Sequence, residues 1–185
     1  MPFLGFPIGI AVADVVCPER CAACDAIVAA AELYCTACAA HVHHLGPPEC
    51  SRCGRPRPEA GCCPTCIASP PPIRTARAWA VYRDDAGASP IAAAVARFKY
   101  GGASRLGRRF AAVMRTRVAA AADVIVPVPL HPARLRERGY NQSAILARHL
   151  GRHLGVPVRL GVIVRTKPTP SQVTVPARAR AGTVT

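Results

Sequence analysis

Short apolar runs separated by longer polar stretches mark the part of the chain after residue 73. The runs at 78–82, 123–128 and 156–164 are bounded by turn residues and predict buried strands. Between them, apolar side chains recur every three or four residues, which is the period of a helix packed on one face. Alternating strands and helices predict an α/β unit with a mostly parallel sheet, in which ligands bind beyond the carboxyl ends of the strands.

Three helices are predicted within this part. The first follows Ser89, whose hydroxyl is a good N-cap, and stops at Gly101. The second spans 104–118 and the third spans 141–154, with Asn141 as its cap. The side chains expected to face the core are Ile91, Val95, Phe98, Leu106, Phe110, Val113, Leu146, Leu150 and Leu154.

The first 70 residues follow a different pattern. The apolar stretch 3–16 predicts a short buried helix and not a secretory signal, because no basic flank precedes it and Asp14 interrupts its end. No uncharged apolar run is long enough to cross a bilayer, so we expect no membrane span and a cytoplasmic location. The proline-rich segment 68–73 predicts a stiff linker. We therefore expect two domains, 1–70 and 73–185.

Charge is distributed unevenly along the chain. Hydrophobic residues make up 51% and charged residues 18%, which is too apolar for a disordered protein. Residues 71–185 carry 20 of the 24 Lys and Arg but only four of the ten acids. This basic part predicts an anionic partner, either nucleic acid or a phosphorylated small molecule. The plainer alternative is a solvated arginine-rich surface.

All ten cysteines lie in the acidic part, and eight of them form four Cys-x-x-Cys pairs. Such a pair turns two sulfurs toward one ion, and two pairs complete the tetrahedral four-sulfur shell of zinc. The spacings are close to those of zinc ribbons and favour sequential sharing of the pairs, although a cross-braced arrangement stays open. The predicted ligands of the two zinc ions are Cys21, Cys24, Cys35 and Cys38, then Cys50, Cys53, Cys63 and Cys66.

Other chemistries also use paired cysteines. A disulfide framework needs an oxidising compartment, and a thioredoxin-like site needs a single pair at the start of a helix, whereas iron–sulfur ligation uses the same sulfurs and stays open. Of the remaining residues, Cys17 is expected to be buried and Cys62 to compete with Cys63. The histidines at 41, 43 and 44 are expected to face solvent. The net negative charge of this part favours a docking or bracing role over DNA binding.

The basic part contains one candidate anion site, in segment 127–142 after a predicted strand. Arg134, Arg136 and Arg138 alternate there, and Gly139 and Asn141 precede the third predicted helix. Guanidinium groups beside the free N–H groups of a helix start suit a phosphate or pyrophosphate.

The order of these motifs resembles the ComF family. The resemblance covers about residues 21–172 and rests on the tandem cysteine pairs, on Phe98-Lys99-Tyr100-Gly101-Gly102, and on segments 123–130, 134–142 and 165–172. The Arg138-Gly139-Tyr140-Asn141-Gln142 stretch is the most specific part.

The resemblance implies a double zinc ribbon followed by a phosphoribosyltransferase-type, Rossmann-like domain. It further implies a role in natural competence and in the uptake and processing of single-stranded DNA, with DNA-uptake proteins as partners. Phosphoribosyl pyrophosphate would bind with Mg²⁺ at segment 127–142. The implied phosphate-binding residues are Lys99, Arg134, Arg138, Gly139, Asn141 and Gln142, and no catalytic residue is assigned.

One feature of phosphoribosyltransferases is not found in the sequence. These enzymes carry two adjacent acids and a Thr- and Gly-rich turn on a later strand, and the chain stops at Thr185 before such a motif, so we expect the domain to lack its C-terminal part. The Asp84-Asp85 turn is interpreted as an ordinary turn. Whether the chain is a transferase therefore stays open. The alternatives are a non-enzymatic zinc-ribbon adaptor that binds single-stranded DNA or a protein, and a truncated inactive relic.

Overall fold

A computed structural model describes residues 18–82, 89–118 and 122–169. The helices of these ranges are α2 (Thr36–Ala39), α3 (Pro64–Ala68), α4 (Pro90–Tyr100), α5 (Leu106–Arg115), α6 (Pro132–Arg138) and α7 (Gln142–Leu154). The apolar stretch 3–16, Cys17, the Asp84-Asp85 turn and the end of the 165–172 motif lie outside the described residues.

The three predicted helices correspond to α4, α5 and α7. The hydroxyl of Ser89 accepts a hydrogen bond from the N–H of Ala92 (3.2 Å) and caps α4, which ends before Gly101. The side-chain oxygen of Asn141 accepts from the N–H of Ser143 (2.9 Å) and caps α7. Both caps satisfy backbone donors that a helix start leaves without an internal partner, and they confirm the predicted start points.

Helices α5 and α7 pack directly against each other. A Cβ at Gly107 in α5 would lie 2.3 Å from Cγ2 of Ile145 in α7, so only glycine permits this close approach. On α7 the buried residues are Ala147 and Gly151. The predicted inward leucines, at 146, 150 and 154, are only half-buried, because the small residues form the surface against which the neighbouring elements lie.

The predicted strands are largely replaced by extended segments. Among the described residues, pairing consists of isolated bridges, and an extended sheet of the Rossmann-like type is not observed there. Ile125 and Val158 form a parallel bridge, in which the N–H of Ile125 donates to Pro157 O (2.9 Å) and the N–H of Arg159 donates to Ile125 O (3.0 Å). Pro127, Pro129 and Pro157 flank this bridge, and proline removes the N–H that a longer ladder needs.

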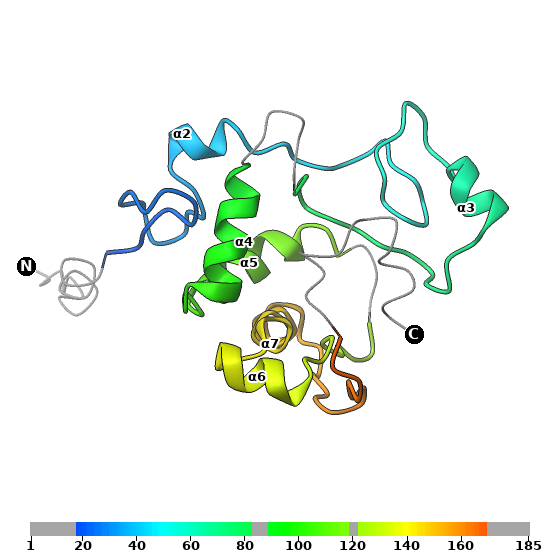
Figure 1. Ribbon diagram of the computed structural model, residues 1–185. Helices are drawn as coiled ribbons and strands as arrows, with labels where there is room; N and C mark the ends of the chain where they lie inside the picture. Colours follow the sequence, from blue (N-terminus) through cyan, green and yellow to red (C-terminus); the bar gives the residue numbers. More distant parts are fainter. Residues whose placement is uncertain (1–17, 83–88, 119–121, 170–185) are drawn as a thin grey trace, which may run out of the picture.

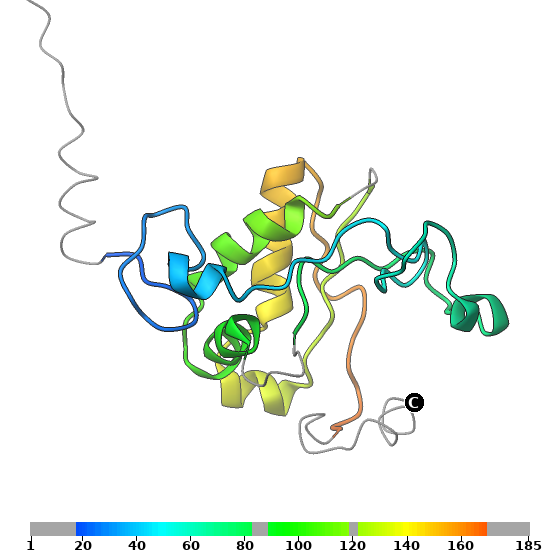
Figure 2. The same cartoon turned by 90° about the horizontal axis from the view of Figure 1, so that it is seen from above.

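The first cysteine region and the helices share one core. Buried Cys21, Leu33 and Tyr34 belong to the same apolar cluster as Phe98 of α4 and Phe110 of α5. Figures 1 and 2 show residues 18–40 lying beside α4, while α3 and its surroundings project away on another side. The second cysteine region forms a separate small cluster centred on Cys50, Cys63 and Cys66. The two cysteine regions therefore differ in how they join the rest of the protein.

No helix in the described ranges has the length and apolar character needed to cross a bilayer.

Candidate metal centres and phosphate site

The first cysteine cluster is formed by two short backbone turns. The N–H of Cys21 donates to Ala26 O (2.7 Å) and the N–H of Asp25 donates to Cys21 O (3.1 Å), which folds the first pair into a tight knuckle. The second pair lies at the start of α2, which begins directly after Cys35. The four sulfurs, from Cys21, Cys24, Cys35 and Cys38, all lie within 4.8 Å of one another.

The second cluster repeats this arrangement. The N–H of Cys50 donates to Arg55 O (2.8 Å), and α3 begins directly after Cys63. The N–H of Cys63 also donates to Sγ of Cys50 (3.3 Å), a contact that favours the thiolate. The sulfurs of Cys50, Cys53, Cys63 and Cys66 lie within 4.8 Å of one another. Both clusters therefore combine cysteines that are sequential in the chain.

In each cluster the pKa of one cysteine thiol is lowered, which favours the thiolate that a metal ion binds. Burial alone would raise the pKa of Cys21, but the N–H groups of Cys24 and Cys35 outweigh it and lower that pKa to about 6. The N–H groups of Cys53 and Cys63 lower the pKa of Cys50 to about 5.

In each cluster a second thiol is shifted the opposite way. Burial, followed by the neighbouring thiols, raises the pKa of Cys38 and raises that of Cys66 to about 12. Four clustered thiolates need a positive charge between them, and four sulfurs are the donor set that zinc prefers. The two cysteine clusters fit two zinc sites.

The remaining cysteine and the histidines lie outside these clusters. Cys62 is not among the grouped sulfurs, whereas Cys63 is. The side chains of His41, His43 and His44 are exposed, as predicted. His44 contacts Trp79 edge-on, with ring centroids 4.6 Å apart.

Arginines from α4 and α5 hold the first cluster. Arg109 is 3% exposed and donates hydrogen bonds of 2.6 Å to Glu32 O and to Arg20 O. Arg97 donates to Cys21 O (3.0 Å) and pairs with the carboxylate of Asp25. Two arginines of the basic part are therefore bound to the backbone around the first cysteine cluster, which we call the first ribbon. No local signal in the sequence predicts these long-range contacts.

One carboxylate joins the second cluster, which we call the second ribbon, to later parts of the chain. Glu49, next to Cys50, pairs with Nε of Arg77 (3.0 Å) and with Arg117, which follows α5. The side chain of Glu49 is 9% exposed, so this pair of contacts is largely shielded from solvent. These ion pairs attach the second ribbon to the helices without a shared apolar core.

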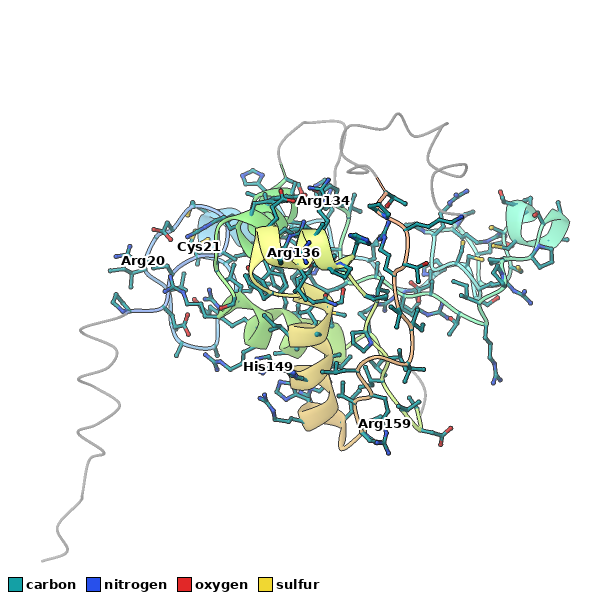
Figure 3. The ribbon with its side chains drawn as sticks, turned by 60° about the horizontal axis from the view of Figure 1, so that its bottom comes forward. Arg20, Cys21, Arg134, Arg136, His149 and Arg159 are labelled. Atoms are coloured by element: carbon teal, nitrogen blue, oxygen red, sulfur yellow. The ribbon has the colours of Figure 1, made fainter. Side chains whose placement is uncertain are left out.

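The predicted anion segment contains a helix that the sequence analysis did not anticipate. Helix α6 begins after His131, whose Nδ1 accepts from the N–H of Ala133 (3.2 Å), and ends at Gly139 with a φ of 79°. Since α6 turns the chain every 3.6 residues, the three alternate arginines do not share one direction. Arg134 pairs with Glu137 (2.9 Å). Figure 3 shows Arg134 and Arg136 projecting from α6, with Arg159 near the far end of α7.

Arg138 lies in a small polar cavity between the ends of α4 and α6. The cavity of about 180 Å³ is lined by Lys99, Tyr100, Gly102, Glu137 and Arg138. The guanidinium of Arg138 lies over the ring of Tyr100, 4.9 Å from its centroid, and donates to Oε1 of Gln142 (2.8 Å). Lys99 and Arg138 are the two predicted site residues that this cavity brings together.

The other predicted residues support the cavity from outside. Gly139 ends α6, and Gln142 orients Arg138. Asn141 uses its oxygen to cap α7 and its Nδ2 to donate to Val128 O (3.1 Å). The first N–H groups of α7 are therefore engaged by Asn141, contrary to the expectation that they are free for an anion.

A contact between Tyr140 and Phe98, which were not predicted as site residues by themselves, holds together two elements beside the cavity. The hydroxyl of Tyr140 donates to Phe98 O, and the two rings lie with centroids 6.1 Å apart. This contact joins the end of α4 to the start of α7. Tyr100 and Gly102 line the cavity as well, and the signal for them was their position beside Lys99 in the Phe98–Gly102 motif.

Comparison with known proteins supports the two cysteine clusters. Residues 12–67 match the double zinc ribbon domain family. The chain is 30% identical over 99 residues to competence protein F of Haemophilus influenzae. This chain is ComF-like. The match covers 49% of the ComF-like chain and 43% of competence protein F, which is less than half of either. No solved structure matches this ComF-like chain significantly.

Proposed function

We propose that this ComF-like chain acts in the cytoplasm in competence, where it binds a phosphorylated ligand in the Lys99–Arg138 cavity. Phosphoribosyl pyrophosphate or a similar pyrophosphate is the proposed ligand, and residues 73–185 are the proposed phosphoribosyltransferase-like domain. The observation that carries the proposal is that two cations distant in sequence, Lys99 and Arg138, line one polar cavity.

The chemistry of the cavity supports a phosphate. A guanidinium has five N–H donors in a planar fork, and the contact of Arg138 with Gln142 uses one of them. Lys99 adds a second positive charge on a flexible four-carbon stem. Glu137 supplies a carboxylate oxygen, the ligand type that the Mg²⁺ of a bound pyrophosphate prefers. The proposal concerns binding, and no described residue is assigned a catalytic step.

A second candidate function is that of a non-enzymatic adaptor. It is favoured by the 20 Lys and Arg against four acids in residues 71–185, which suit the phosphate backbone of single-stranded DNA. In this case the acidic ribbons would bind a protein partner of DNA uptake. An inactive relic, the third alternative, would bind neither ligand.

Calorimetric titration of the zinc-loaded chain with phosphoribosyl pyrophosphate and Mg²⁺ separates these cases. We expect saturable heat that Arg138→Ala abolishes and Arg136→Ala retains, because Arg136 is exposed on the same helix but does not line the cavity. Saturable heat with Arg138→Ala equal to wild type would refute the cavity as the site. Salt-dependent binding of single-stranded DNA without this heat would favour the adaptor.

A further inference from the structure

Tyr100 is an exposed aromatic side chain in the wall of the phosphate cavity. It is 63% exposed, and it is the last residue of α4, next to Lys99. Phe98, two residues earlier, is 3% exposed and lies in the apolar core. That core, as formed by the described residues, includes Phe98 and Phe110 but not Tyr100. The ring of Tyr100 therefore contributes little to folding and is accessible to a ligand.

One face of this ring is already used. The guanidinium of Arg138 lies 4.9 Å from the ring centroid, a cation–π contact that fixes the two side chains relative to each other. One guanidinium can cover only one face of the ring, and most of the Tyr100 surface, 63%, is still exposed.

The space beside the ring is also open. Gly102 lines the same cavity, and a Cβ built on it would meet no atom within 4 Å. Its φ of +65° disfavours any side chain there, so the backbone keeps this space clear. A flat group can thus approach the cavity without displacing protein atoms.

We propose that Tyr100 stacks a base of single-stranded DNA while Lys99 and Arg138 bind the adjoining phosphate. This inference rests on the proposed phosphate cavity and extends it from a phosphate to a nucleotide strand. Single-stranded nucleic acids are bound by a cationic groove together with exposed aromatic rings, and both elements meet here. A strand is favoured over a free nucleotide because 20 of the 24 Lys and Arg lie in residues 71–185, which provides further backbone contacts.

The test compares four ligands on the zinc-loaded chain: a short poly-dT oligonucleotide, its abasic counterpart, dTMP and inorganic pyrophosphate. Tyr100→Leu removes the stacking face and Tyr100→Phe restores it. Tyr82→Leu is the matched control, since Tyr82 is 48% exposed but does not line the cavity. We expect Tyr100→Leu to weaken poly-dT binding about 5-fold or more beyond any loss it causes for pyrophosphate and the abasic strand, since leucine also removes the cation–π contact with Arg138. Tyr100→Phe and Tyr82→Leu should bind poly-dT like wild type.

The other outcomes overturn the proposal in distinguishable ways. If Tyr100→Leu weakens pyrophosphate and poly-dT equally, Tyr100 only positions Arg138. If it leaves both unchanged, the base does not stack there, although the phosphate site stands. If dTMP binds as tightly as poly-dT, the ligand is a free nucleotide and not a strand. If neither pyrophosphate nor poly-dT binds, the phosphate cavity itself fails and the stacking site with it.

Discussion

The buried guanidinium of Arg109, in α5, donates a 2.6 Å hydrogen bond to the backbone carbonyl of Glu32, just before the second cysteine pair of the first ribbon. Its other terminal nitrogen donates to Arg20 O, just before the first pair. Burial lowers the pKa of Arg109 from its usual value, and Glu19 nearby opposes that shift. One side chain of the basic part thus bridges the two cysteine pairs of the first ribbon, so this ribbon and the helices form one structural unit.

Replacing Arg109 should destabilise that whole unit. Arg109→Met removes the charged donor of two part-buried hydrogen bonds to carbonyls, and we expect a loss of about 3 kcal/mol in the free energy of unfolding. Arg108→Met is the control, because the Arg108 side chain is 54% exposed and pairs with Glu19 at the surface. It should cost less than about 1 kcal/mol. Chemical denaturation of the zinc-loaded variants measures both, and equal losses would refute the bridging role.

The two metal centres should differ in their effect on the fold. Cys21 and Cys50 are both 0% exposed, so serine at either position removes one ligand from a comparably buried site. Cys21→Ser should lose one zinc and also unfold α4 and α5, because its cluster shares their core. Cys50→Ser should lose one zinc but keep the helices folded, because its cluster is separate.

Zinc content and circular dichroism measured on both variants decide this point. The near-ultraviolet signal of Trp79, which stacks with Tyr34 of the first ribbon, reports on the shared core. Identical spectra for Cys21→Ser and Cys50→Ser would contradict the difference between the centres.

A methyl group at the contact of α5 and α7 should be destabilising. Alanine favours a helix over glycine, yet a Cβ at position 107 would meet Cγ2 of Ile145 at 2.3 Å. We expect Gly107→Ala to lower the free energy of unfolding by about 1–3 kcal/mol. Thermal denaturation of the double variant with Ile145→Ala should show that the two losses are not additive. Additive losses would place the strain elsewhere.

Acid should weaken the fold in part through His149 on α7. Burial, then the charges of Arg152 and His153, lowers the pKa of His149 below its usual value of 6.5. The unfolded chain therefore takes up a proton first, and stability is lost as the pH falls below about 6.5. His149→Gln should lose less stability than wild type over this range, with zinc held in excess for both. Parallel curves of unfolding free energy against pH would show that His149 is not involved.

The sequence predicted those elements that depend on local signals. Ser89 and Asn141 marked two helix starts because each cap bonds to an N–H two or three residues ahead. The cysteine pairs predicted two metal clusters because the spacing itself sets the knuckle geometry. Helix α6 was missed, since its residues 132–138 lack an apolar period and its cap is His131, an uncommon N-cap.

Features that depend on distant residues were beyond sequence reasoning. Nothing near Arg97 or Arg109 indicates that its partners are carbonyls of the first ribbon. The sequence did not show whether the alternate arginines face one ligand, and in the structure Arg138 lines the cavity while Arg134 pairs with Glu137. Apolar runs predicted strands, but the prolines beside Ile125 and Val158 limit their pairing to a bridge.

The most direct test of the phosphate cavity is a titration of the isotope-labelled, zinc-loaded chain with pyrophosphate, followed by amide chemical shifts in NMR spectra. The amides of Lys99, Gly102 and Arg138 line or flank the ligand position and should shift together in a saturable way. Those of the second ribbon around Cys50 should not move. Shifts absent from the cavity, or concentrated elsewhere on the chain, would contradict the proposed site.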